Sequence, residues 1–356
     1  MRRILITGIC GFVGSTLAIK LMEAVSGIDI FGLDNFVRPG SEYNRARLKN
    51  LGISFYHGDI RCPSDFECLP RVDWVIDAAA SSSILAGVDE HTSSLQLVEN
   101  NLFGTVNLLE YCKKYETGFT LISTSRVYSV EPLSNLPIES GNDAYRLAEN
   151  QKLPIGVSAE GVDETFSTTP PVSLYGSTKL ASEVLALEYG EAFNFPVWIN
   201  RCGVLAGAGQ FGRPDQGIFA FWINSWLQRK PLAYIGFGGN GYQVRDCLHP
   251  QDLVPLLLKQ MNCIDAKDRI FNLGGGASHA MSLAELSGWC RDRFGNHHVT
   301  NNHEIRRFDI PWMIMDVALA KQTWGWMPET TSEEILAEIA DHAEQHPEWL
   351  ELSGVL

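Results

Sequence analysis

The sequence predicts an α/β fold: a doubly wound parallel sheet with helices on both faces, and a smaller C-terminal α/β lobe. Short apolar runs alternate with helical stretches through the first 128 residues, which is the pattern of a parallel sheet. A glycine-rich turn joins the first apolar run to the first helical stretch. The chain has 356 residues and is 45% hydrophobic, so it can bury a large core and is long enough for two lobes.

The elements of the first lobe follow one another in order. Five short apolar runs predict strands near 4–7, 29–33, 53–57, 73–77 and 119–123. The stretches between them predict helices near 12–25, 43–50 and 93–115. The carboxyl ends of parallel strands meet at one edge of a sheet, where the active sites of such folds lie. We therefore expect the polar residues that follow these strands to gather at that edge.

A long irregular stretch separates these elements from the next regular ones. Residues 129–173 contain five prolines, and we expect them to form a loop that arches over the site. A helix is expected over 175–193, followed by a strand over 197–201.

The second lobe has a looser pattern. Strand-like runs occur at 232–235 and 269–272, and Ser282 with Glu285 predicts a capping box at the start of a later helix. We therefore expect two domains, residues 1–200 and 201–356, with segments interleaved between them.

The turn Gly8-Ile9-Cys10-Gly11-Phe12-Val13-Gly14 lies between a strand and a helix, which is the order of a Rossmann-type dinucleotide site. Gly8 would permit the tight turn and Gly11 the close approach of a pyrophosphate, while Gly14 would let the helix pack on the strand. The N-terminal amides of the helix would face the phosphates.

Asp34 follows the second strand, at the position where a carboxylate can accept hydrogen bonds from both ribose hydroxyls of the cofactor. A carboxylate there repels a 2′-phosphate, which favours NAD over NADP. Arg38 and Arg45 stand nearby in the sequence and leave NADP open as the alternative.

Composition excludes several classes of function. The net charge of −14 argues against nucleic acid as a partner. The eight cysteines are scattered, which indicates reduced thiols, and no ligand cluster predicts a metal. No apolar run approaches the roughly 20 residues that span a bilayer, so we expect no membrane partner and a cytoplasmic location.

Tyr175 and Lys179 are four residues apart on an expected helix, so their side chains share one face. An ammonium one turn from a phenol favours the phenolate, which would make Tyr175 a usable base near neutral pH. Thr124 ends the fifth strand, and its hydroxyl could orient a substrate oxygen.

With these features the chain resembles the extended short-chain dehydrogenase/reductase family, over nearly its whole length. The resemblance implies that Thr124, Tyr175 and Lys179 form the catalytic set. Residues 1–200 are expected to bind NAD and to carry the helix of Tyr175 and Lys179, and residues 201–356 are expected mainly to bind the substrate. The cofactor-binding residues expected from the turn, the strand ends and the resemblance are Gly8, Cys10, Gly11, Phe12, Val13, Gly14, Asp34, Asn35, Asp59, Ile60, Ala78, Ala79, Ala80, Asn101, Ser123, Tyr175 and Lys179. Asp59 is expected to accept a hydrogen bond from the adenine amine. The substrate-binding residues expected are Ser81, Thr124, Ser125, Gln216, Arg245 and Arg306, with the two arginines on the diphosphate.

Three longer segments resemble a narrower group, the CDP-tyvelose (CDP-paratose) 2-epimerases: 161–164, 210–218 and 239–249. This resemblance implies tightly held NAD, a nucleotide-diphosphate sugar as substrate with a CDP-sugar favoured, and epimerisation by transient oxidation of a sugar hydroxyl and return of the same hydride. The family also implies a homodimer or homotetramer that pairs through the long helices near 93–115 and 175–193.

Several alternatives remain open. A 4-epimerase or a 4-ketosugar reductase would use the same Tyr175 and Lys179, and a non-catalytic NAD-binding sensor is a hypothesis from another class. Elimination is disfavoured because Ser125-Arg126 supplies no acid after Thr124. Asp77 stands where the family usually has histidine; we expect it to be a hydrogen-bonded strand-end carboxylate rather than part of the hydroxyl-binding wall.

Overall fold

The computed structural model describes residues 2–88, 92–263, 266–304 and 306–354. It divides into two compact units, each assembled from three segments of the chain. Unit 1 comprises the residues up to Thr124, Leu174–Arg201 and Pro250–Phe271. Unit 2 comprises Ser125–Ser173, Cys202–His249 and the residues from Asn272 onward. The boundary at residue 200, and the assignment of one lobe to cofactor and the other to substrate, stay predictions.

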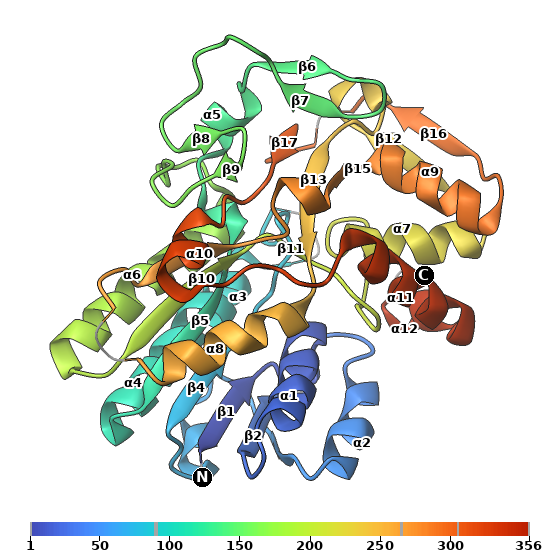
Figure 1. Cartoon of the computed structure of the whole chain (residues 1–356). Helices are drawn as coiled ribbons and strands as arrows, with labels where there is room; N and C mark the ends of the chain where they lie inside the picture. The colour runs from blue at the N-terminus through green and yellow to red at the C-terminus, as the bar shows by residue number, and fades with distance from the viewer. Residues whose placement is uncertain (1, 89–91, 264–265, 305, 355–356) are drawn as a thin grey trace. The chain divides into compact units, whose positions relative to one another are not determined.

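The described residues of unit 1 build a seven-stranded sheet in the order β14-β10-β5-β4-β1-β2-β3 (Figure 1). Its strands are β1 (Arg3–Thr7), β2 (Asp29–Asp34), β3 (Ser54–His57), β4 (Trp74–Asp77), β5 (Gly118–Thr124), β10 (Val197–Cys202) and β14 (Ile270–Leu273). The pairs β1–β2, β1–β4, β2–β3 and β4–β5 are parallel, which confirms the predicted Rossmann-type α/β fold. The strand order reverses beside β1, and ligands of such sheets bind at this switch point.

Helices flank this sheet. They are α1 (Phe12–Ala24), α2 (Glu42–Asn50), α3 (Ser94–Val98), α4 (Gly104–Tyr115), α6 (Ser173–Phe193) and α8 (Leu253–Met261). Helices α1 and α8 pack against each other, as Figure 1 shows. The single helix expected over 93–115 is interrupted by a π-helical turn, Glu99–Phe103, between α3 and α4. Such turns are rare and occur frequently at functional sites.

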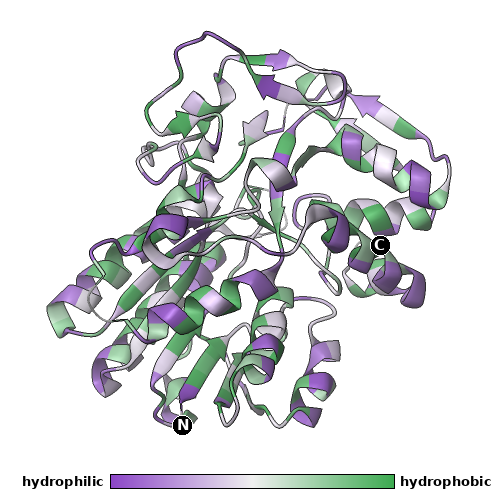
Figure 2. Ribbon diagram, viewed as in Figure 1, coloured by the Kyte–Doolittle hydropathy of each residue, from purple (hydrophilic) through white to green (hydrophobic). Residues whose placement is uncertain are grey.

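The core of unit 1 lies between the sheet and its helices. Buried side chains from the strands, such as Leu5, Val75 and Phe119, pack with Leu108 of α4 and Ala186 of α6. Much of the length of the strands is green in Figure 2, as expected for a parallel sheet covered on both faces.

Unit 2 is built around a smaller sheet and three helices. Strand β13 (Val244–Leu248) pairs with β11 (Val204–Leu205), β15 (Ala280–Ser282) and β17 (Trp312–Met313), while β12 (Leu232–Ile235) pairs with β16 (Val299–Asn302). Helices α7 (Ile218–Leu227), α9 (Leu283–Phe294) and α11 (Ser332–Gln345) enclose its core, and the short helices α10 (Ala318–Trp324) and α12 (Trp349–Leu352) complete the unit. The predicted capping box of Ser282 and Glu285 is confirmed at the start of α9.

Two expectations about the irregular regions change. The stretch 129–173 holds a short helix and two small antiparallel hairpins: α5 (Val130–Ser134), β6 (Ile138–Ser140) with β7 (Tyr145–Leu147), and β8 (Val157–Ser158) with β9 (Gly161–Val162). Its prolines do not prevent this, since Pro137 directly precedes a strand, where a missing N–H costs little. The run at 269–272, expected in the second lobe, begins β14 of the unit 1 sheet instead.

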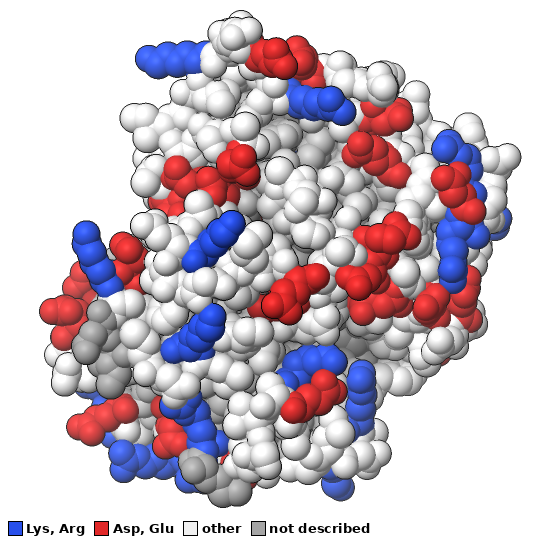
Figure 3. Space-filling view, viewed as in Figure 1, with Lys and Arg blue, Asp and Glu red and all other residues white. Residues whose placement is uncertain are grey.

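Acidic and basic side chains are interspersed over the face that Figure 3 presents. Within the described residues, no helix is both long enough and apolar enough to cross a membrane.

Candidate active site

The glycine turn after β1, where a pyrophosphate is expected, packs tightly against the neighbouring backbone. Gly8 has a φ of +61°, and its N–H donates to Leu33 O at 2.9 Å. A Cβ at Gly14 would lie 2.3 Å from Gly8 O, and a Cβ at Gly8 would lie 2.9 Å from Ala79 Cα. Both positions therefore exclude any side chain, because the turn packs closely against the first turn of α1 and against the loop after β4. Burial raises the pKa of the Cys10 thiol to about 12, so the side chain is a neutral thiol near pH 7.

Asp34 is held beside this turn at the end of β2. Its Oδ2 accepts from Cys10 N–H at 2.8 Å and its Oδ1 from Phe36 N–H at 2.8 Å. Burial raises the pKa of Asp34, while these backbone N–H groups lower it. The carboxylate is thus fixed next to the glycine turn, as a ribose-binding acid requires.

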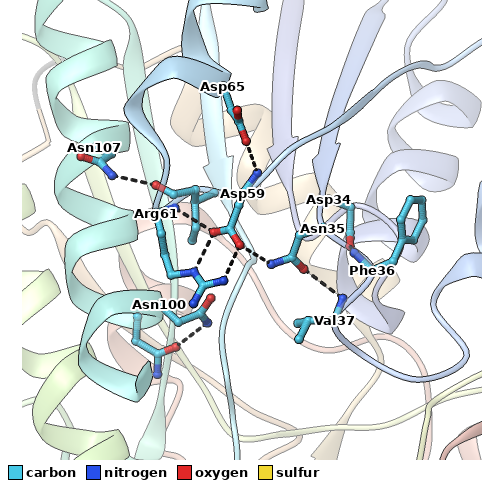
Figure 4. Close-up of polar contacts among 11 residues, drawn as sticks. Asp34, Asn35, Phe36, Val37, Asp59, Arg61, Asp65, Asn100 and Asn107 are labelled. Atoms are coloured by element: carbon cyan, nitrogen blue, oxygen red, sulfur yellow. Dashed lines mark hydrogen bonds and ion pairs between the residues drawn. The ribbon is translucent and has the colours of Figure 1, made fainter. Parts of the chain in front are cut away.

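Asp59 belongs to a polar cluster with Asn35 and Arg61 (Figure 4). Asn35 donates to Asp59 Oδ2 at 2.9 Å, and the guanidinium of Arg61 donates to both carboxylate oxygens at 2.9 and 2.6 Å. Arg61 N–H adds a fourth bond to Oδ1 at 2.9 Å. The hydrogen bonds from Arg61 lower the pKa of Asp59 to about 2.

These contacts bear on the role expected for Asp59. A carboxylate has about four lone-pair sites, and four hydrogen bonds already reach this one. An adenine amine would have to share or replace one of these donors. Asp59 N–H in turn donates to Asp65 at 2.7 Å, and Asn107 donates to Ile60 O at 2.8 Å (Figure 4). Side chains therefore hold the loop of residues 58–61, which follows β3.

Asp77 is a hydrogen-bonded strand-end carboxylate, as expected. Its side chain is fully buried and accepts from Thr7 Oγ1 at 2.8 Å and from Thr105 Oγ1 at 2.9 Å. Thr7 Oγ1 accepts in turn from Ala79 N–H at 3.3 Å. Asp77 therefore orders the loop that carries Ala78, Ala79 and Ala80.

Asn101 lies in the π-helical turn and forms hydrogen bonds to both backbone groups of Ser81, in the loop after β4. Its Oδ1 accepts from Ser81 N–H at 2.8 Å, and its Nδ2 donates to Ser81 O at 3.0 Å and to Thr178 Oγ1 at 3.2 Å. The Ser182 hydroxyl donates to Asn101 O at 3.1 Å, and the Thr105 hydroxyl, whose single proton Asp77 also accepts, lies 2.9 Å from the same oxygen. One buried asparagine thus joins the loop after β4 to helix α6.

The predicted catalytic residues all lie in unit 1. Thr124 ends β5, and Tyr175 and Lys179 lie one turn apart on α6. Tyr175 is 6% exposed and Lys179 only 2% exposed. A charge acts strongly where solvent is excluded. The buried ammonium of Lys179, on the same face of α6 as Tyr175, can therefore favour the phenolate form of Tyr175.

Unit 2 brings the two predicted diphosphate arginines near each other. Arg245 donates to Asp309 Oδ1 at 3.0 Å and to Ile310 O at 2.7 Å. Burial lowers the pKa of Arg245, and the charge of Arg306 lowers it further, while that of Asp309 raises it. Arg306 donates to Pro214 O at 3.2 Å, which brings it to the segment that carries Gln216. Ser125 opens a 3₁₀ turn that belongs to the same unit.

The sequence did not single out three residues that the structure adds to these sites. Arg61 binds the carboxylate of Asp59 in the loop after β3, and Glu183 pairs with Arg201 inside unit 1. Glu183 carried a signal, since it lies one turn beyond Lys179 on the same helix. None of the eight cysteines, all of which the structure describes, forms a disulfide. The described residues contain no group of three or more histidines, cysteines and carboxylates arranged to hold a metal.

Comparison with known proteins gives consistent matches over the chain. The model of the NAD-dependent epimerase/dehydratase family matches residues 4–274. The CDP-paratose 2-epimerase of Salmonella typhi is 28% identical over 355 residues, which cover 95% of this chain and 98% of that protein. The UDP-glucuronate 4-epimerase of Thermodesulfobacterium geofontis is 25% identical, and the match covers 97% of each chain.

Solved structures show the same fold. The UDP-glucuronic acid 4-epimerase of Bacillus cereus, in complex with UDP-glucuronic acid and NAD, has a TM-score of 0.75 at 25% identity and covers 96% of this chain and 99% of its own. The UDP-glucose 4-epimerase of Thermotoga maritima with UDP-glucose has a TM-score of 0.76 at 23% identity, with the same coverage.

Proposed function

Because this chain belongs to the NAD-dependent epimerase/dehydratase family and is an NAD-dependent enzyme, we propose that it epimerises the sugar of a nucleotide-diphosphate sugar. The observation that carries the proposal is the buried Tyr175 and Lys179 pair on α6, with Thr124 in the same unit.

Each residue has a distinct task in this proposal. Thr124 holds the reacting sugar oxygen by a hydrogen bond. Tyr175 takes the proton of the sugar hydroxyl and later returns a proton to the same oxygen, while Lys179 stabilises the phenolate. The chemistry that bound NAD would supply is acceptance of a hydride from the sugar carbon and its return to the same carbon. Arg245 and Arg306 provide guanidinium groups for the diphosphate of the substrate.

Epimerisation is preferred to elimination because of the residues that come after Thr124. The next two are Ser125 and Arg126, so no carboxylate stands there to remove or supply a second proton. A CDP-sugar epimerised at C2 is the substrate and reaction we favour, because the similarity to CDP-paratose 2-epimerase extends over 95% of the chain. Epimerisation at C4 is the second candidate, favoured by the matches to 4-epimerases.

We also propose that two copies of the chain pair through α4 and α6. These helices are neighbours, since Tyr189 donates to Glu110 at 2.8 Å and the Lys113 ammonium lies 4.6 Å from the ring centre of Phe193. Their region presents large apolar side chains to solvent, namely Leu95, Phe103, Val184 and Phe193. A second copy of the same face would cover them.

The substitution Tyr175→Phe tests the catalytic assignment. It removes the proton-carrying oxygen and leaves the ring, so we expect turnover of the substrate to fall by at least about a hundredfold. NAD should remain bound, as measured by the cofactor released on denaturation. Thr178→Ser, on the same helix, keeps its hydroxyl; it is the matched control and should keep activity. Undiminished turnover in Tyr175→Phe would contradict the mechanism.

A further inference from the structure

Glu183 extends the catalytic face of α6 into the interior of unit 1. Tyr175, Lys179 and Glu183 are spaced by four residues, so they lie on one side of the helix. The Glu183 carboxylate is 1% exposed, which makes it one of the most deeply buried charges among the described residues.

The carboxylate of Glu183 is paired with Arg201, the residue before the end of β10. Arg201 Nε donates to its two oxygens at 3.2 and 3.1 Å, and Arg201 Nη2 donates to Oε2 at 2.7 Å. The guanidinium is itself 5% exposed. A planar guanidinium fixes the orientation of a carboxylate in a way that an ammonium does not.

Ser123 completes the network from a third element. Its hydroxyl donates to Glu183 Oε1, and its backbone directly precedes Thr124 at the end of β5. One carboxylate therefore ties together the strand that carries Thr124, the helix that carries Tyr175 and Lys179, and the neighbouring strand β10.

Apolar side chains could fill the same space, and buried ion pairs are poor contributors to stability compared with such packing. What apolar packing cannot supply is a fixed orientation between the helix and the strand end. A neutral pair also adds no net charge near the phenol. Loss of one partner would leave a single buried charge about 12 Å along the helix from Tyr175, given a rise of about 1.5 Å per residue.

We propose that Glu183 and Arg201 are positioning residues of the reaction: they hold Tyr175 and Lys179 in register with Thr124 and keep this part of the site electrically balanced. The proposal rests on the catalytic role proposed for Tyr175.

The test measures the ionisation of Tyr175 directly. The ultraviolet absorbance of tyrosinate is followed against pH in the NAD-loaded protein, and the same protein with Tyr175→Phe is subtracted. Glu183→Gln removes a buried negative charge about 12 Å along the helix from Tyr175. This loss favours the phenolate, so the ionisation of Tyr175 should move to lower pH by about one unit at an effective dielectric constant of about 20.

Two further variants separate charge from orientation. Arg201→Lys keeps the charge and loses the planar fork, and the double variant Glu183→Gln/Arg201→Gln removes both charges. In both, Tyr175 should ionise at the wild-type pH, while kcat should fall by about tenfold or more with KM within about twofold. The double variant also serves if Glu183→Gln alone does not fold.

An unchanged or raised ionisation pH in Glu183→Gln would overturn the electrostatic part of the proposal. Wild-type kcat in both Arg201→Lys and the double variant would overturn the positioning part. If the catalytic role proposed for Tyr175 is wrong, Tyr175→Phe keeps full turnover. That result does not depend on the Glu183 and Arg201 variants, so the two proposals can be contradicted separately.

Discussion

Asp246 shows how burial sets the behaviour of a single residue in unit 2. It accepts from Gly276 N–H at 3.1 Å and from Met315 N–H at 3.4 Å, and it is 1% exposed. Burial raises its pKa from 3.8 to about 6. Between about pH 4 and pH 6 the folded protein therefore keeps a proton on Asp246 that the unfolded chain has released. As pH rises through this range, Asp246 lowers the free energy of unfolding.

Asp246→Asn should remove this pH dependence. The amide oxygen can accept both backbone bonds, since both now end on Oδ2. The shift of about two units corresponds to about 3 kcal/mol, so the free energy of unfolding of the wild type should fall relative to the variant by up to that amount between pH 4 and pH 6.

Urea unfolding at a series of pH values measures the difference. A difference between wild type and Asp246→Asn that stays constant from pH 4 to pH 7 would show that Asp246 does not titrate in this window.

At the residue scale, sequence reasoning identified groups whose role is local. Gly8 and Gly14 follow from the turn they build, and Asp34 follows from its place after β2. The partners of Asp59 and Glu183 could not be inferred in the same way. The pair of Glu183 and Arg201 depends on how α6 packs on β10, and Ser123 reaches it because β5 and β10 are neighbours in the sheet. The local sequence of a single element predicts neither contact.

Helices α4 and α6 carry the element-scale prediction. Val184 is 54% exposed and Phe103 is 52% exposed. Full burial of an exposed large apolar side chain is worth about 1.5–3 kcal/mol, so covering the exposed half of each of these side chains contributes about half of that to pairing with a second copy. The variant Phe103→Glu/Val184→Glu should therefore dissociate the dimer into monomers.

Ile155 supplies the control, because it is 85% exposed in unit 2. Ile155→Glu should leave the dimer intact. Sedimentation at matched concentrations distinguishes the masses. A monomeric wild type, or a dimer that survives Phe103→Glu/Val184→Glu, would contradict the proposed interface.

Sequence patterns located most elements of unit 1 and missed some details within them. The interruption between α3 and α4 depends on Asn101, whose partners Ser81 and Thr178 lie far away in the chain. The small hairpins of 129–173 are two or three residues per strand, which is too short for a period of alternation to be recognised.

For the whole molecule, the sequence indicated the fold class but could not assign segments of the chain to the two compact units. Unit 1 takes Leu174–Arg201 and Pro250–Phe271 from beyond the point where the chain first leaves it. Contacts between strands that are distant in sequence decide which unit such a segment joins. Local patterns of hydrophobicity do not predict these contacts.

The most direct test of the proposed epimerisation is the fate of the hydrogen at the epimerised carbon. The NAD-loaded protein is incubated in heavy water with CDP-paratose, and then with a panel of CDP-, UDP-, GDP- and dTDP-sugars, and the products are followed by NMR. Transient oxidation and hydride return predict a product epimeric at one carbon that retains its original hydrogen. Solvent deuterium at that carbon would contradict this mechanism, as would an unsaturated or deoxygenated sugar.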